Sequence, residues 1–154
     1  MQRRKPYMKT GIVFYSKHHG NTKKLLDAIA AKHEMALIDV LDDNAVDLNQ
    51  FDRIGFASGI YYGKFAKQLL AYAKTYLPEN KEVFFIGTCG APRDGYFSDI
   101  REITDERKCK CLGKYLCLGF DTFGPFKLVG GIAKGHPDDK EIEDAVKYYE
   151  GLGS

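Results

Sequence analysis

The polar segment SKHHGNT, residues 16–22, follows an apolar run that ends at Tyr15. It offers two hydroxyls, an amide and two imidazoles around one glycine, and a helix-like pattern begins at Leu25. The first turn of a helix presents unpaired N–H groups and the positive end of the helix dipole, so this segment has the composition of an anion site, usually for phosphate. The alternative is that Asn21 or Thr22 simply caps the helix.

The segment differs from the dinucleotide-binding G-x-G-x-x-G and from the G-K-[ST] ending of nucleoside triphosphatases, so it predicts a cradle for one phosphate. A second candidate segment is SGIYYGKF, residues 58–65, in which two glycines bracket Ile60, Tyr61 and Tyr62. We expect it to turn from a strand that ends at Ser58 into a helix. A flat ring needs flat apolar partners and close backbone approach, and this segment offers both. The alternative is an ordinary turn with exposed tyrosines.

Five short apolar runs precede or separate these segments and are expected to position them. The runs are rich in β-branched and aromatic residues and nearly continuous in apolar character, which is typical of parallel strands covered on both faces. They are Gly11–Tyr15, Met35–Val40, Arg53–Ser58, Val83–Thr88 and Tyr115–Phe120.

Helix-like patterns alternate with the runs. Apolar stripes lie within residues 25–30, 65–77 and 142–149, residues 97–108 form a weaker helix, and residues 42–51 form a short or irregular connection. The pattern predicts a doubly wound α/β domain with a five-stranded parallel sheet in the order 2-1-3-4-5 and helices on both faces. Ligands of such folds bind beyond the carboxyl ends of the strands, so the turns after strands 1, 3, 4 and 5 should carry the function.

Response regulators share this strand order but need an acidic pair after strand 1 and an aspartate at the end of strand 3. This chain has Ser16-Lys17-His18 and Ala57-Ser58-Gly59 there, which argues against phosphoryl signalling.

The 154 residues suit one domain, which we place at residues 9–154 after a basic arm at residues 1–8. The net charge is +2, but removing the four cations of residues 1–9 leaves 19 basic residues against 21 acidic ones, which argues against a nucleic-acid partner.

No apolar run approaches the ~20 residues of a membrane span, and no signal-peptide core follows the arm, so we expect a soluble cytoplasmic protein. The four cysteines lack the paired spacing of structural zinc sites, so we expect no metal, and because no export signal is found we expect reduced thiols.

The stretch YSKHHGNTKKLLDAIA resembles the FMN phosphate-binding loop of the flavodoxin family, although the commoner loop has small hydroxyl residues at positions 17–19. The segment SGIYYGKF resembles the flavin-ring loop of flavodoxin-like proteins, especially the quinone- and protoporphyrinogen-dehydrogenase branch. The resemblance spans roughly residues 9–152 and implies an FMN-binding flavoprotein. By resemblance, the residues around the phosphate are Ser16, Lys17, His18, His19, Gly20, Asn21 and Thr22.

The same resemblance assigns residues to the flavin ring. The ring loop would be Ser58, Gly59, Ile60, Tyr61, Tyr62 and Gly63; the backbone of Thr88, Cys89 and Gly90 would meet the pyrimidine edge; and Tyr96 or Phe97 would close the other face. We expect Cys89 to make packing contact without a covalent bond.

Three functions remain open. An FMN electron carrier between redox proteins needs no catalytic acid or base, and the sequence offers no convincing triad. An FMN-dependent quinone- or protoporphyrinogen-type oxidoreductase would instead use a small quinone-like acceptor, and the tyrosine-rich loop favours it. A module that keeps the fold without flavin is the third. The carrier is preferred, as a monomer or homodimer.

Overall fold

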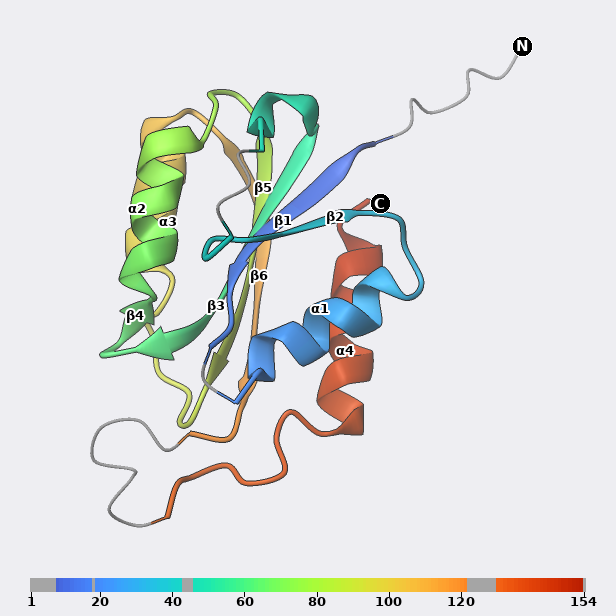
Figure 1. The fold of residues 1–154 in the computed structure, drawn as a ribbon, viewed down its shortest axis with the longest axis vertical. Coiled ribbons are helices and arrows are strands. Elements are labelled where there is room, and N and C mark those ends of the chain that lie inside the picture. Colours follow the sequence, from blue (N-terminus) through green and yellow to red (C-terminus); the bar gives the residue numbers. More distant parts are fainter. Residues whose placement is uncertain (1–7, 18, 43–45, 122–129, 154) are drawn as a thin grey trace.

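The computed structural model describes residues 8–17, 19–42, 46–121 and 130–153, and a parallel sheet forms its centre (Figure 1). The five parallel strands are β1 (Thr10–Tyr15), β2 (Ala36–Asp39), β3 (Arg53–Tyr61), β5 (Glu82–Cys89) and β6 (Lys110–Leu118). Their spatial order, β2-β1-β3-β5-β6, confirms the predicted order of five parallel strands. A two-residue strand, β4 (Lys64–Phe65), pairs antiparallel with the end of β3.

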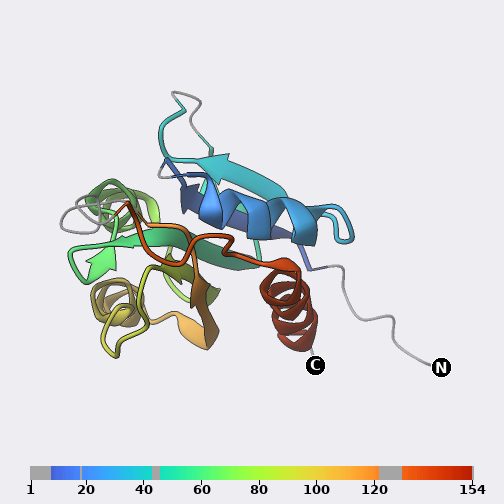
Figure 2. The same cartoon turned by 90° about the horizontal axis from the view of Figure 1, so that it is seen from below.

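Helices cover both faces of this sheet, as the sequence predicted. In Figure 1, α1 (Asn21–Ala30) and α4 (Asp139–Gly151) lie on one side of the strands, and α2 (Lys67–Tyr76) and α3 (Ser98–Glu106) lie on the other. Figure 2 shows the same two groups from below, with the strands between them. A short 3-10 helix, η1 (Leu48–Gln50), interrupts the connection that precedes β3. None of the helices within the described residues combines the length and apolar character needed to cross a membrane.

The apolar stripes of the helices account for this arrangement. Leu25, Leu26 and Ile29 of α1 are fully buried, and so is Leu69 of α2. They pack on opposite faces of strands whose side chains are buried on both sides. Each such side chain contributes about 1.5–3 kcal/mol by leaving water, and the two-sided burial explains why the strand sequences lack polar alternation.

The register of the strands brings their carboxyl ends to one edge of the sheet. Tyr15 lies beside Ser58, Gly59 beside Thr88, and Cys89 beside Leu118. The segments that follow β1, β3, β5 and β6 therefore emerge together at the lower end of the sheet in Figure 1. This is the edge at which doubly wound folds bind ligands.

The third predicted strand was wrong at its carboxyl end. We predicted that it ends at Ser58 and turns into a helix, but β3 continues to Tyr61 and forms a hairpin with β4 before α2 begins at Lys67. The two-residue turn has positive φ at both positions, 50° at Tyr62 and 80° at Gly63. Two residues with positive φ match the right-handed twist of a tight hairpin, and only Gly63 adopts that conformation without steric cost.

The last predicted strand was wrong at both ends. We predicted Tyr115–Phe120, but β6 begins at Lys110 and ends at Leu118. The backbone then leaves the sheet, because the Gly119 N–H donates to the Cys89 carbonyl (2.8 Å) and the Phe120 N–H to the His136 carbonyl (2.9 Å). An apolar run alone does not reveal where such a change of partner occurs.

Candidate functional site

A groove runs along the carboxyl edge of the sheet, and we call it the edge groove. Its inner part and its wider outer part share Ile60, Cys89, Gly90 and Asp121, so the two are continuous. The outer part encloses about 550 Å³, within the range of small-molecule sites. The inner part is lined by Ser16, Asn21, Thr22, Gly59, Ile60, Tyr61, Thr88, Cys89, Gly90, Gly119, Phe120 and Asp121.

Hydroxyl groups meet at the inner end of the edge groove, where α1 begins. The Thr22 hydroxyl lies 2.9 Å from the Thr88 hydroxyl, and both residues are buried. The Ser16 hydroxyl accepts a hydrogen bond from the Lys23 N–H at 2.9 Å. Hydroxyls and the N–H groups of the first helical turn are all suited to an oxyanion, because each can donate a hydrogen bond to it.

Asn21 ties the start of α1 to the segment after β6. Its Nδ2 donates to the Phe120 carbonyl at 2.8 Å, and its buried Oδ1 has no hydrogen-bond partner in the described part of the chain. The alternative that Asn21 or Thr22 caps α1 is wrong: the N-cap residue is Gly20, and both side chains project from the helix into the protein. The two residues therefore shape the groove wall.

The outer part of the edge groove lies between the β3–β4 hairpin and the segment after β5. Its lining consists of Ile60, Tyr62, Gly63, Cys89, Gly90, Ala91, Arg93, Asp94, Gly95, Tyr96 and Asp121. The Tyr96 hydroxyl donates to the Ala91 carbonyl at 2.7 Å, which holds this segment in a compact loop. Burial raises the pKa of the Cys89 thiol to about 11, and the carboxylates of Asp121 and Glu141 add to the shift. The thiol is therefore neutral, as a packing residue should be.

Some predicted site residues do not line the edge groove. Lys17 and His19 are exposed beside it, the His19 ring packs 4.5 Å from the Phe120 ring, and His18 lies outside the described residues. Ser58 is fully buried, where its hydroxyl donates to the Gly59 carbonyl and accepts from the Ala66 N–H. Phe97 lies in the core, 5.3 Å from the Phe65 ring.

The sequence interpretation missed the groove residues Gly119, Phe120 and Asp121. The misplaced end of the last strand put the first two inside the sheet. From the sequence we did expect the turn after the last strand to carry function, because ligands of doubly wound folds bind beyond the carboxyl ends of the strands. That rule could have identified these three residues if the strand end had been placed correctly. Asp121 also forms an isolated antiparallel bridge with Ile132, with N–H···O distances of 2.9 and 2.8 Å in the two directions.

The amino-acid sequence matches a known protein family. Residues 12–107 match the family model described as a flavodoxin domain. The chain belongs to the flavodoxin family. An uncharacterized protein of Methanocaldococcus jannaschii is 31% identical to this chain over 147 residues. The match covers 94% of this chain and 98% of that protein.

Solved structures show the same fold as this flavodoxin-family chain. A flavodoxin of Streptococcus pneumoniae superposes with a TM-score of 0.67 at 16% identity, covering 94% of this chain and 97% of that one. General stress protein 14 of Treponema denticola, solved in complex with FMN, gives 0.65 at 12% identity, with 94% and 99% covered. A Lactobacillus acidophilus flavoprotein in complex with FMN gives 0.56 at 23% identity, with 71% and 93% covered.

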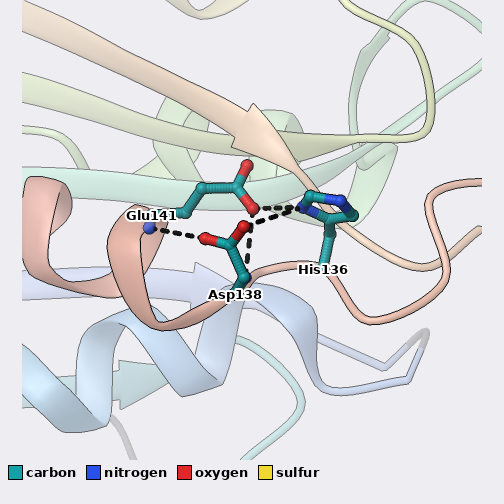
Figure 3. A group of neighbouring side chains, drawn as sticks. All are labelled: His136, Asp138 and Glu141. Carbon is teal, nitrogen blue, oxygen red and sulfur yellow. Dashed lines mark hydrogen bonds and ion pairs between the residues drawn. The ribbon is translucent and has the colours of Figure 1, made fainter.

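A cluster of His136, Asp138 and Glu141 stands at the start of α4 in the flavodoxin-family chain (Figure 3). Their ligand atoms lie within 4.8 Å of one another, as in a metal site. However, hydrogen bonds account for the geometry, because Asp138 and Glu141 form a capping box. The Glu141 carboxylate also accepts from the Leu118 N–H at 2.9 Å and bonds Nδ1 of His136. The cluster thus fastens the end of β6 to α4.

This cluster predicts a pH dependence of stability. The hydrogen bond to Glu141 raises the pKa of His136 above its usual value, so protonated His136 stabilises the fold at low pH and this contribution is lost as pH rises through the raised pKa. Thermal melts between about pH 6 and pH 8 should show the native chain losing stability relative to His136→Gln. Parallel pH profiles of the two proteins would contradict this. The pKa of Asp138 is lowered, chiefly by the Glu141 N–H, so its contribution is lost only in acid.

The hairpin turn predicts a gain in stability from substitution. Tyr62 has φ 50°, a backbone conformation that is costly for a bulky residue. Its side chain is 83% exposed, so burial of the ring does not offset that cost. Asparagine tolerates this conformation better, and Tyr62→Asn should raise the free energy of unfolding by about 0.5–1 kcal/mol in urea titrations. The control is Tyr76→Asn, since Tyr76 is also exposed but lies in α2. A loss of stability at Tyr62 equal to the loss at Tyr76 would contradict the prediction.

Proposed function

We propose that this chain binds FMN in the edge groove and transfers electrons between redox partners. One observation supports the proposal most strongly. The start of α1, which is lined with hydroxyl groups, meets a groove whose walls contain glycines. They meet between β1 and β3, where the strand order reverses and doubly wound folds bind their ligands. The family membership and the FMN complexes of structures with the same fold support it.

The inner end of the groove offers the hydrogen-bond donors that the phosphate of FMN needs, and because it encloses only about 10 Å³, its walls must move apart to admit the phosphate. Thr22, Thr88 and Ser16 supply hydroxyls, and the first turn of α1 supplies N–H groups and positive partial charge. Asn21 has a different role, because its Oδ1, which has no hydrogen-bond partner among the described residues, is an acceptor and would be repelled by phosphate oxygens. A hydroxyl of the ribityl chain is a donor of the kind that Oδ1 lacks.

The outer part fits the ring of FMN. Ile60, Tyr62 and Tyr96 supply apolar and aromatic surfaces, and the glycines Gly59, Gly63 and Gly90 allow close backbone approach. The Asp121 carboxylate accepts hydrogen bonds, and the flavin ring carries one N–H donor. Bound FMN would supply the electron transfer itself, so the chain has only to hold, orient and partly shield it.

An electron carrier with bound FMN passes electrons to a partner protein, whereas an FMN-dependent oxidoreductase turns over small substrates without a partner. We would reduce the FMN-loaded protein with dithionite, remove the excess, and mix it anaerobically with oxidised cytochrome c in a stopped-flow instrument. Reduction of the cytochrome is the expected result for a carrier, and a failure to reduce it would contradict the proposal. Steady oxidation of NADH or NADPH with the quinone menadione, in the absence of any partner protein, would favour the oxidoreductase instead.

A further inference from the structure

A second hollow lies against the β3–β4 hairpin and is distinct from the edge groove. We call it the hairpin hollow. It encloses about 320 Å³ and is lined by Tyr15, Tyr61, Tyr62, Lys64, Phe65, Ala66, Lys67 and Gln68. Tyr61 also lines the inner part of the edge groove and Tyr62 its outer part, so these two tyrosines separate the hollows.

The walls of the hairpin hollow are aromatic. The rings of Tyr15 and Tyr61 meet edge-to-face with centroids 5.8 Å apart, and Phe65 is buried beside them. Tyr62 stands exposed at the rim. Rings in this arrangement present both faces and edges, which suits contact with another planar aromatic system.

The charge at the hairpin hollow is positive. Lys64 and Lys67 line it, and among the residues that the structure describes no aspartate or glutamate does. Lys64 lies 3.9 Å from Asp99, with both side chains about half exposed, a contact that contributes little in water. No ion pair of Lys67 occurs among the residues that the structure describes. Lys64 and Lys67 also line a neighbouring hollow on the side of α3, together with the acidic residues Asp99, Glu102 and Glu106, so the two lysines lie between the aromatic rings and this acidic surface.

We propose that the hairpin hollow binds a planar aromatic anion, such as a quinone or aromatic acid that carries a carboxylate or sulfonate. The tyrosine rings contact the aromatic system, and the two ammonium groups attract the anionic group. The volume of about 320 Å³ accommodates a compound of two or three fused rings. A molecule held there lies one tyrosine side chain away from the edge groove. The proposal does not depend on FMN, because the hollow is complete without any groove ligand.

The test uses anthraquinone-2-sulfonate as the anionic probe and menadione as a neutral one. Isothermal titration is performed on the flavin-free chain and on the chain saturated with FMN. We expect the sulfonate to bind both forms, more weakly at high salt, and more tightly than menadione. The double variant Lys64→Gln/Lys67→Gln should lose about three- to tenfold in affinity for the sulfonate while its affinity for menadione stays unchanged.

The control variant is Lys32→Gln/Lys147→Gln, which removes two exposed lysines outside the hairpin hollow. It should bind the sulfonate like the native chain. NMR shifts of the Gln68 side-chain amide should change on titration, which locates the probe. The proposal is overturned if the two lysine pairs have equal effects, if FMN displaces the probe, or if hexaglutamate binds the hollow and the sulfonate does not. The last result would indicate an acidic protein partner. Failure of FMN to bind would overturn the proposed function while leaving this test intact.

Discussion

Replacement of Thr22 with glutamate should weaken FMN binding at least about a hundredfold, because it removes a hydroxyl donor and adds a negative charge at the proposed phosphate position. Thr22 is 1% exposed, and its hydroxyl lies 2.9 Å from that of Thr88 at the inner end of the edge groove. A hydrogen bond to a charged group contributes about 1.5–3 kcal/mol, and carboxylate–phosphate repulsion adds to that loss. Fluorescence titration with FMN measures the dissociation constant.

Two further variants separate this effect from misfolding. Thr22→Val keeps the shape but loses the hydroxyl, and it should weaken binding by about tenfold. Ala31→Glu adds the same charge at the exposed opposite end of α1, where binding should stay native. If Thr22→Glu is folded by circular dichroism and binds FMN normally, the phosphate does not lie at this end of the groove.

Replacement of Gly119 with alanine should both destabilise the fold and weaken FMN binding. A Cβ at this position would lie 2.7 Å from Nδ2 and 2.9 Å from Cγ of Asn21, closer than real contacts allow. Asn21 is 6% exposed and bonded to the Phe120 carbonyl, so it has little room to yield. Overpacking of this kind costs about 1–3 kcal/mol of unfolding free energy. We expect an FMN dissociation constant raised by about tenfold or more, because the groove wall must shift.

The matched control is Gly151→Ala, where an added Cβ meets no described atom within 4 Å. Urea unfolding should show no loss of stability in this variant, and FMN titration should show native affinity. If Gly119→Ala were as stable as Gly151→Ala and bound FMN equally well, the segment after β6 would not be a wall of the FMN site.

The sequence did not predict β4, but it predicted the five parallel strands and their order correctly, because buried parallel strands carry nearly continuous apolar runs. These strands are apolar because both of their faces are buried. The helices that cover them are buried on one side, so each carries a single apolar stripe. Helix α1 was predicted as well, but its N-cap is Gly20, so the hydroxyl and amide side chains that suggested a cap do not form one. The strand order could then be tested against the neighbours of each strand in the structure.

The parts that failed depend on long-range partners. The end of β6 is set by hydrogen bonds to Cys89 and His136, which no local pattern encodes. The hairpin places Tyr62 at positive φ, against the usual preference of a bulky residue, so the expected turn into a helix was wrong. Phe97 carries the same aromatic signal as Tyr96, yet packing against Phe65 and Phe85 places it in the core.

The visible absorption spectrum of the purified chain, before and after incubation with FMN and removal of unbound flavin, tests the central claim most directly. We expect flavin bands that remain with the protein in a 1:1 ratio and are shifted in shape, because the proposed ring site is an aromatic groove. Thr22→Glu, treated in the same way, should retain little flavin. A native chain that retains no flavin after incubation at high FMN concentration would contradict the proposed function.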